Sequence, residues 1–233
     1  MDLIRDAIRE TFLLLLQGDS EIWSITLRTL IICGCSTIIS FIVGASVGFC
    51  LAVLPFRGRA VLVTFANTGM GMPPVIAGLL VAVLLWRSGP FGGLNLIYTP
   101  IAMIISQCVI AIPLVAAITA GSFMSLPESL FLQIRSLGAG RKETLFLLAY
   151  EARLGLMVAM MAGFGAVISE VGAAMMVGGN LAGDTRVLTT ATVLLVSKGE
   201  FGRALAYGIV LLAMVFIVAL VLTSVQNLAR KRI

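Results

Sequence analysis

The chain has 233 residues, of which 60% are hydrophobic and 12% are charged. Soluble globular domains contain about half and about a quarter of these residue types, so the composition excludes an ordinary soluble domain and indicates an integral membrane protein. The net charge of +5 comes from Lys and Arg dispersed among the polar segments without a basic stripe. This dispersion argues against nucleic acid as a partner and leaves membrane lipid as the surroundings.

Residues 1–20 are expected to form a short N-terminal amphipathic helix that lies along the membrane surface. Leu3, Ile4, Ala7 and Ile8 recur at helical spacing, while the charges fall on the other side. Residues 21–233 are expected to form a single transmembrane domain.

Five apolar segments are long enough to cross a hydrocarbon core, which takes roughly 20 helical residues. We predict an all-α membrane protein with five transmembrane helices, at about residues 25–54, 60–86, 101–123, 154–177 and 204–228. Pro73 and Pro74 should break or kink the second helix, because proline cannot continue the helical hydrogen bonding. The apolar stretch 187–196 is too short to cross and is expected at the surface or as a re-entrant piece.

Segment 126–153, between the third and fourth spans, mixes charged and apolar residues around the glycine turn at 138–140. This pattern predicts two short helices in water or against another protein. The basic residues predict that this segment and the C-terminus are cytoplasmic and that the N-terminus is outside. With the surface helix set aside, nine Lys and Arg then lie inside and five outside.

The sequence QIRSLGAGRKETLFLLAYEARLGL, with Gly138 at its turn, resembles the cytoplasmic EAA loop of ABC importer permeases, although the first glutamate of that signature has no counterpart here. The resemblance implies a coupling helix that docks into a cleft of an ATPase subunit, where a push is transmitted only by an element that moves as a body. The coupling residues that it implies are Gln133, Arg135, Ser136, Leu137, Gly138, Ala139, Gly140, Arg141 and Lys142. An ordinary amphipathic loop helix at the membrane surface is the alternative.

Three further stretches are similar to the permeases of the tungstate and molybdate importer family. They are MGMPPVIAGLL at 70–80, RSGPFGGL at 87–94 and ISEVGAAMMVGGN at 168–180, and the last favours the tungstate branch. The resemblance implies the type I ABC importer permease architecture in a bacterial inner membrane. It also implies a homodimer with two cytoplasmic ATPase subunits, which receives tungstate from an extracytoplasmic oxyanion-binding protein and moves it by alternating access. A permease for molybdate, sulfate or another small solute is the alternative.

Glu170 is an acidic residue within a predicted span, and such carboxylates are costly and normally face the bundle interior, a cavity or a partner. We expect it to act as a gate element, hydrogen-bonded across the dimer or to backbone donors of the glycine-rich turn. A helix-end glutamate satisfied by water or an arginine is the alternative. The predicted translocation pathway and gate consists of Glu170, Gly172, Pro73 and Pro74.

The sequence has no phosphate-cradling GxxxxGK[ST] motif, so the chain itself is not expected to be an enzyme. We expect no cofactor or metal in this chain, with ATP and Mg²⁺ bound by the partner ATPase. A carrier driven by an ion gradient, with Glu170 as the coupling carboxylate, is a second alternative. Gly44 and Gly48 form a GxxxG spacing that favours close helix packing, either within the subunit or between two copies.

Overall fold

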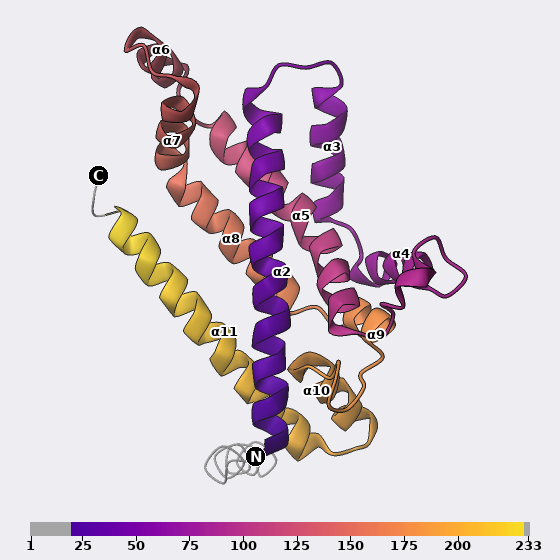
Figure 1. The fold of residues 1–233 in the computed structure, drawn as a ribbon. Coiled ribbons are helices and arrows are strands. Elements are labelled where there is room, and N and C mark those ends of the chain that lie inside the picture. Colours follow the sequence, from indigo (N-terminus) through magenta and orange to yellow (C-terminus); the bar gives the residue numbers. More distant parts are fainter. Residues whose placement is uncertain (1–19, 231–233) are drawn as a thin grey trace.

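A computed structural model describes residues 20–230, and every regular element in this range is a helix (Figure 1). The predicted surface helix over 1–20 lies, apart from Ser20, outside the described residues. The helices are α2 Ser20–Val53, α3 Arg59–Met70, α4 Pro74–Leu85, the 3-10 helix η1 Gly92–Leu94, α5 Pro100–Met124, α6 Glu128–Ser136, α7 Arg141–Glu151, α8 Arg153–Ile168, α9 Gly172–Gly178, α10 Leu188–Ser197 and α11 Phe201–Arg230.

Three single helices, α2, α5 and α11, are long and apolar enough to cross a membrane, and they fall on the first, third and fifth predicted spans. Two bent pairs bring the possible number of crossings to five: α3 with α4, at 106°, and α7 with α8, at 68°. The break between α3 and α4 falls at the predicted proline pair. Pro73 is extended, with φ −61° and ψ 126°, and Pro74 is the first residue of α4.

The predicted continuous helix over 154–177 is wrong, because the structure divides it. α8 ends at Ile168, and a new helix, α9, begins at Gly172. The three residues between them contain no proline, and the physical cause of the break is side-chain capping of α9 by Glu170. The short apolar stretch after it forms α10, whose first turn, Leu188 to Ala191, is buried within the protein.

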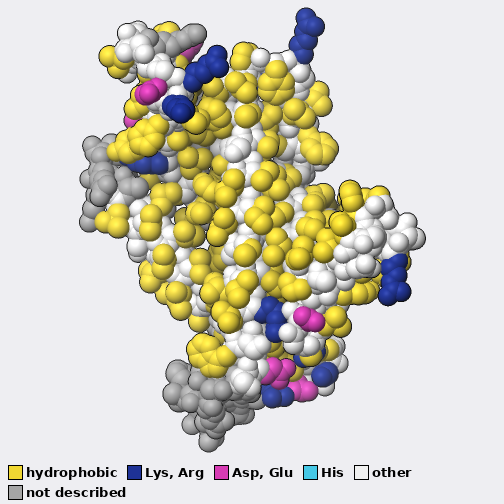
Figure 2. Space-filling view, in the orientation of Figure 1, with side chains coloured by type: hydrophobic (Ala, Val, Ile, Leu, Met, Phe, Trp, Pro, Cys, Tyr) yellow, Lys and Arg dark blue, Asp and Glu magenta, His cyan; other side chains and the backbone are white. Residues whose placement is uncertain are grey.

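The long helix α2 runs the whole length of the molecule beside α5 (Figure 1). The α6–α7 hairpin lies at one end, together with the turn from α2 to α3. The start of α2, α10 and the start of α11 lie at the opposite end. In Figure 2 hydrophobic side chains cover the middle of the visible face, while charged atoms gather toward the ends and at the tip of α4. This surface suits a helical protein in lipid.

The GxxxG pair packs within the subunit, against α5. A Cβ added to Gly44 would lie 2.8 Å from Val115 Cβ, and one added to Gly48 would lie 2.5 Å from the Ala116 carbonyl oxygen. The same interface holds a buried polar contact, in which Ser36 Oγ lies 2.7 Å from Gln107 Oε1. Small residues thus let the backbones of α2 and α5 approach closely, as in other membrane bundles.

Replacing Gly48 with alanine should therefore lower the stability of the folded chain by roughly 1–3 kcal/mol, because the new methyl group forces α2 and α5 apart. The matched control is Gly34→Ala in the same helix, where an added Cβ meets nothing within 4 Å. Thermal unfolding of both variants in detergent measures the difference. Equal unfolding midpoints would contradict this close packing.

Candidate functional site

Glu170 lies in the break between α8 and α9, and its carboxylate caps α9. Oε1 accepts a hydrogen bond from the backbone N–H of Ala173 at 2.6 Å, and Oε2 accepts one from that of Ala174 at 2.9 Å. The residue is only 4% exposed. A negative side chain is stabilised at this position, because the first N–H groups of a helix lack intrahelical acceptors and carry partial positive charge.

The structure therefore gives Glu170 backbone partners, but these are the N–H groups of Ala173 and Ala174 and not the expected donors of the glycine-rich turn. Within residues 20–230 neither of the ion pairs that the structure shows involves Glu170. The oxygen atoms of its side chain are engaged inside the fold, so the carboxylate acts on the position of α9. A gating role for Glu170 remains a prediction.

α9 packs tightly on the first turns of α4. A Cβ on Gly172 would lie 2.7 Å from Val75 Cγ2, and one on Gly78 would lie 2.5 Å from the Ala173 Cα. Val75 directly follows Pro74, so the structure brings the predicted gate residues Glu170 and Gly172 to the start of the helix that the proline pair creates. The sequence predicts that these residues belong to one gate, but it does not predict the contact between α9 and α4.

Two threonines that the sequence analysis missed connect this region to α10 and α2. Thr189 Oγ1 donates to the Glu170 carbonyl oxygen at 3.3 Å, and Thr29 Oγ1 accepts from the Leu188 backbone N–H at 2.9 Å. Both threonines are buried. In the sequence, both are hydroxyl residues within apolar segments. A buried hydroxyl group needs a hydrogen-bond partner, and this requirement is the signal that could have identified them.

Two arginines hold the loop between α9 and α10 against the start of α2. Arg28 donates from Nη2 to the Gly183 carbonyl at 2.7 Å and from Nη1 to the Arg186 carbonyl at 3.1 Å. Arg186 forms an ion pair with Glu21 at 3.4 Å. These contacts fix the position of the loop that follows α9.

The predicted pair of short helices around a glycine turn is confirmed by α6 and α7. Gly138 has φ +69°, a left-handed conformation in which a side chain would be strained. Ile134 of α6 and Leu148 of α7 are buried in one cluster with Phe123 at the end of α5. Phe123 in turn meets Phe49 of α2 edge to face, with ring centroids 5.1 Å apart. Buried side chains of both hairpin helices thus join one cluster with the end of α5.

The outer surface of this hairpin is unusually apolar for a segment that carries so many charges. Leu137 at the turn is 84% exposed, Phe146 is 70% exposed and Leu132 is 60% exposed. Arg141 and Lys142, in the first turn of α7, add exposed positive charge beside them. Large exposed apolar side chains next to charges are typical of a protein interaction surface.

Comparison with known families gives a match to the binding-protein-dependent transport system inner membrane component over residues 37–233. The tungstate uptake system permease protein TupB of Peptoclostridium acidaminophilum is 34% identical over 227 residues, which cover 97% of this chain and 100% of that protein. TupB of Campylobacter jejuni is 30% identical over 93% of this chain and 90% of its own length. The molybdenum transport system permease protein ModB of Escherichia coli K12 is 24% identical over 90% of this chain and 96% of its own length.

Solved structures share the fold at low sequence identity. A chain of the inward-facing MetNI methionine ABC transporter has a TM-score of 0.68 at 18% identity, over 90% of this chain and 94% of that one. A chain of a bacterial ABC transporter for import of the acidic polysaccharide alginate has a TM-score of 0.74 at 17% identity, over 95% of this chain and 83% of that one. These two structures establish the architecture alone.

Glu170→Ala should destabilise the folded chain, because it leaves the buried N–H groups of Ala173 and Ala174 without acceptors, at roughly 1–3 kcal/mol for each unsatisfied group. Glu170→Gln keeps one acceptor oxygen and should cost less. Glu200→Ala serves as the control: Glu200 is partly exposed, with a side-chain exposure of 39%, and its pair with Arg203 at 3.3 Å is of a kind worth only about 0.2–1 kcal/mol. Thermal unfolding measures the difference. Equal unfolding midpoints for the Glu170→Ala variant and the control would contradict the capping role.

Proposed function

Because this chain belongs to the family of binding-protein-dependent transport system inner membrane components and is an ABC permease of the tungstate and molybdate importers, we propose that its cargo is tungstate. The observation that carries the choice is the 34% identity to a tungstate uptake permease along essentially the full length of both chains. The corresponding identity to a molybdenum permease is 24%. Molybdate is the second candidate, and sulfate or another small solute would use the same architecture.

Import of such an ion needs an energy source. A divalent anion that enters a cell with a negative interior moves against the membrane potential at about 2.3 kcal/mol per charge per 100 mV, or roughly 4.6 kcal/mol for two charges. We place ATP and Mg²⁺ in a separate ATPase subunit, as expected for a permease subunit. No cofactor of this chain enters the proposed mechanism.

The α6–α7 hairpin is the proposed contact with that ATPase. The exposed Leu137 and Phe146 supply apolar surface for a cleft, and Arg141 and Lys142 supply charge at its margin. The cluster that Ile134 and Leu148 share with Phe123 supports this role, because it joins both hairpin helices to the end of α5. Gln133 to Lys142 is the segment that we assign to coupling.

The proposed gate is the junction of α4 and α9 at Pro73, Pro74, Glu170 and Gly172. Both side-chain oxygens of Glu170 accept backbone N–H groups of α9, so its proposed role is to fix α9 and not to contact the anion. Alternating access then requires that this junction differ between two conformations, each favoured by a different state of the partners. The extracytoplasmic binding protein supplies the cargo and its selection.

The proposed assembly is a homodimer in the inner membrane, with the N-terminus outside and the C-terminus in the cytoplasm. The end of the molecule that carries the α6–α7 hairpin then faces the ATPases, and the end with α10 faces the binding protein (Figure 1). This orientation is supported by the basic residues of the hairpin and of the turn between α2 and α3, since cytoplasmic loops carry an excess of Lys and Arg.

Deletion of the gene should lower cellular tungsten in cells grown on trace tungstate, and complementation should restore it. Mass spectrometry of tungsten and molybdenum in the same samples measures both candidates, with excess molybdate added to half of the cultures. Tungsten uptake that excess molybdate does not suppress in wild-type cells supports the tungstate assignment. Loss of molybdenum alone would assign molybdate, and unchanged contents of both metals would refute both.

Gly138→Val should uncouple ATP hydrolysis from transport, because the left-handed turn at the tip of the hairpin would be strained. Gly199→Val is the matched control: Gly199, at the opposite end of the chain's fold, also has a positive φ, at +78°, and an added Cβ there likewise meets nothing within 4 Å. Both variants should insert normally, and only the first should lower uptake per ATP hydrolysed in the assembled transporter. Equal coupling in the two variants would remove the hairpin from the mechanism.

A further inference from the structure

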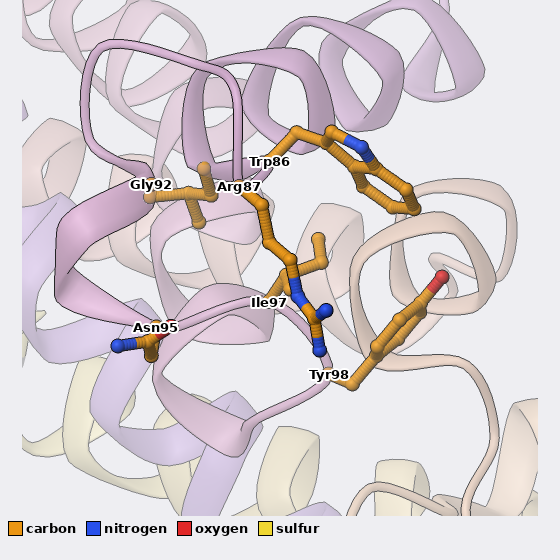
Figure 3. Close-up of a pocket in the computed structure, with 7 residues that line it drawn as sticks. Trp86, Arg87, Gly92, Asn95, Ile97 and Tyr98 are labelled. Atoms are coloured by element: carbon orange, nitrogen blue, oxygen red, sulfur yellow. The ribbon is translucent and has the colours of Figure 1, made fainter.

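A pocket at the end of α4 lies apart from the Glu170 junction, with a volume of about 320 Å³. That volume lies within the range of small-molecule sites. Its walls include Trp86, Arg87, Asn95 and Tyr98 (Figure 3). The Arg87 guanidinium points toward the Tyr98 ring, with Trp86 on the same side. The Asn95 amide points away from the guanidinium, and its Nδ2 donates to the Gly93 carbonyl at 3.4 Å. The rings of Trp86 and Tyr98 meet edge to face at 6.4 Å.

Arg87 is an uncompensated cation. Among the described residues it has no ion pair or hydrogen bond in the structure, and its side chain is exposed. No Asp or Glu occurs anywhere in residues 22–127. The residues that line the pocket and those of α3, α4 and α5 therefore include no acidic residue. Figure 2 shows Lys or Arg atoms at the tip of α4 with no Asp or Glu atoms next to them. An unpaired guanidinium in a pocket whose lining residues include no Asp or Glu favours an anionic ligand.

The pocket is preformed by a tightly wound loop. The Phe91 backbone N–H donates to the Leu84 carbonyl at 3.0 Å, which satisfies a carbonyl at the end of α4 without using Arg87. Gly89 and Gly92 lie against backbone carbonyls of the segment 83–87, where a Cβ would not fit. The Arg87 guanidinium is therefore left free for a ligand. Because the loop is already ordered, ligand binding costs less conformational entropy than binding to a mobile loop would.

The pocket is also joined to the proposed gate. Tyr98 donates its backbone N–H to the Val177 carbonyl of α9 at 2.8 Å, and its ring lies on Gly179, where an added Cβ would be 2.8 Å from Tyr98 Cδ1. α9 is the helix that Glu170 caps. A ligand that contacts Tyr98 thus touches a residue whose backbone is bonded to the gate helix.

We propose that this pocket binds a tetrahedral oxyanion group through the Arg87 guanidinium, beside the Tyr98 ring. A planar guanidinium with several N–H donors matches two oxygens of such a group at once. The group has two possible sources. One is the free cargo oxyanion on its way in, a reading that rests on the proposed function. The other is a phospholipid phosphate, because an apolar groove along Leu79, Ala82 and Val83 shares Trp86 with the pocket and could take an acyl chain.

The test uses the full-length chain purified in detergent and washed free of lipid. Equilibrium dialysis against sodium tungstate, with tungsten measured by mass spectrometry, gives the free-ion arm. Native mass spectrometry after incubation with phosphatidylglycerol gives the lipid arm. Each arm compares the wild type with Arg87→Gln and with the control Arg57→Gln, which removes the same charge from an exposed site in the turn before α3.

If the pocket binds tungstate or the lipid, Arg87→Gln should weaken binding of that ligand roughly tenfold, and Arg57→Gln should leave it unchanged. Arg87→Lys, which keeps the charge and loses the planar donors, should fall between the wild type and Arg87→Gln. An Arg87-dependent loss of tungstate binding assigns the free oxyanion, and an Arg87-dependent loss of bound lipid assigns the phosphate.

Equal binding by the wild type, Arg87→Gln and Arg57→Gln in both arms would overturn the proposal. Because neither arm requires transport, this failure is distinct from a failure of the cargo assignment, which the metal content of cells decides.

Discussion

The backbone N–H groups at the start of α9 need hydrogen-bond acceptors in a buried place, and this requirement shapes the centre of the molecule. Glu170 meets it with both carboxylate oxygens. The position of α9 then sets the packing of Gly78 on Ala173, and it provides the Val177 carbonyl that anchors Tyr98. Unsatisfied backbone groups are costly inside a membrane protein, so the break is tolerated only because the carboxylate accompanies it. One buried acidic side chain thereby fixes α9, α4 and the loop beyond α4 relative to one another.

A single helix, α8, leads from the hairpin to this junction. It begins at Arg153, directly after α7, and ends at Ile168, two residues before Glu170. α8 also packs along α5 and α2, with Gly163 lying against Val115. In the proposed mechanism, a displacement of the hairpin by an ATPase would reach α9 through this helix, because a continuous helix moves largely as a body. In that mechanism the exposed apolar side chains of the hairpin and the buried carboxylate are the two ends of one mechanical connection.

The sequence predicts those features of the fold that depend on local chemistry. Long uncharged runs predicted α2, α5 and α11, the proline pair predicted the break before α4, and the Gly138 turn predicted the hairpin. The break at Glu170 was missed, because the neighbouring residues are apolar and helical in character and only the three-dimensional contact of its carboxylate with α9 reveals the cap. The partner of the Gly44–Gly48 pair could not be predicted either, since close-packing glycines serve contacts within and between subunits equally well. The Arg87 pocket depends on Tyr98 meeting α9, a contact between segments far apart in the chain.

In the proposed mechanism this chain moves tungstate only when a separate ATPase drives it. The most direct measurement is tungsten uptake into proteoliposomes that contain the chain with its ATPase and binding protein, compared with proteoliposomes that contain the chain alone under an imposed proton or sodium gradient. We expect accumulation that requires ATP and both partners, with no uptake by the chain alone. Accumulation by the chain alone under an ion gradient would contradict it and would identify an ion-coupled carrier instead.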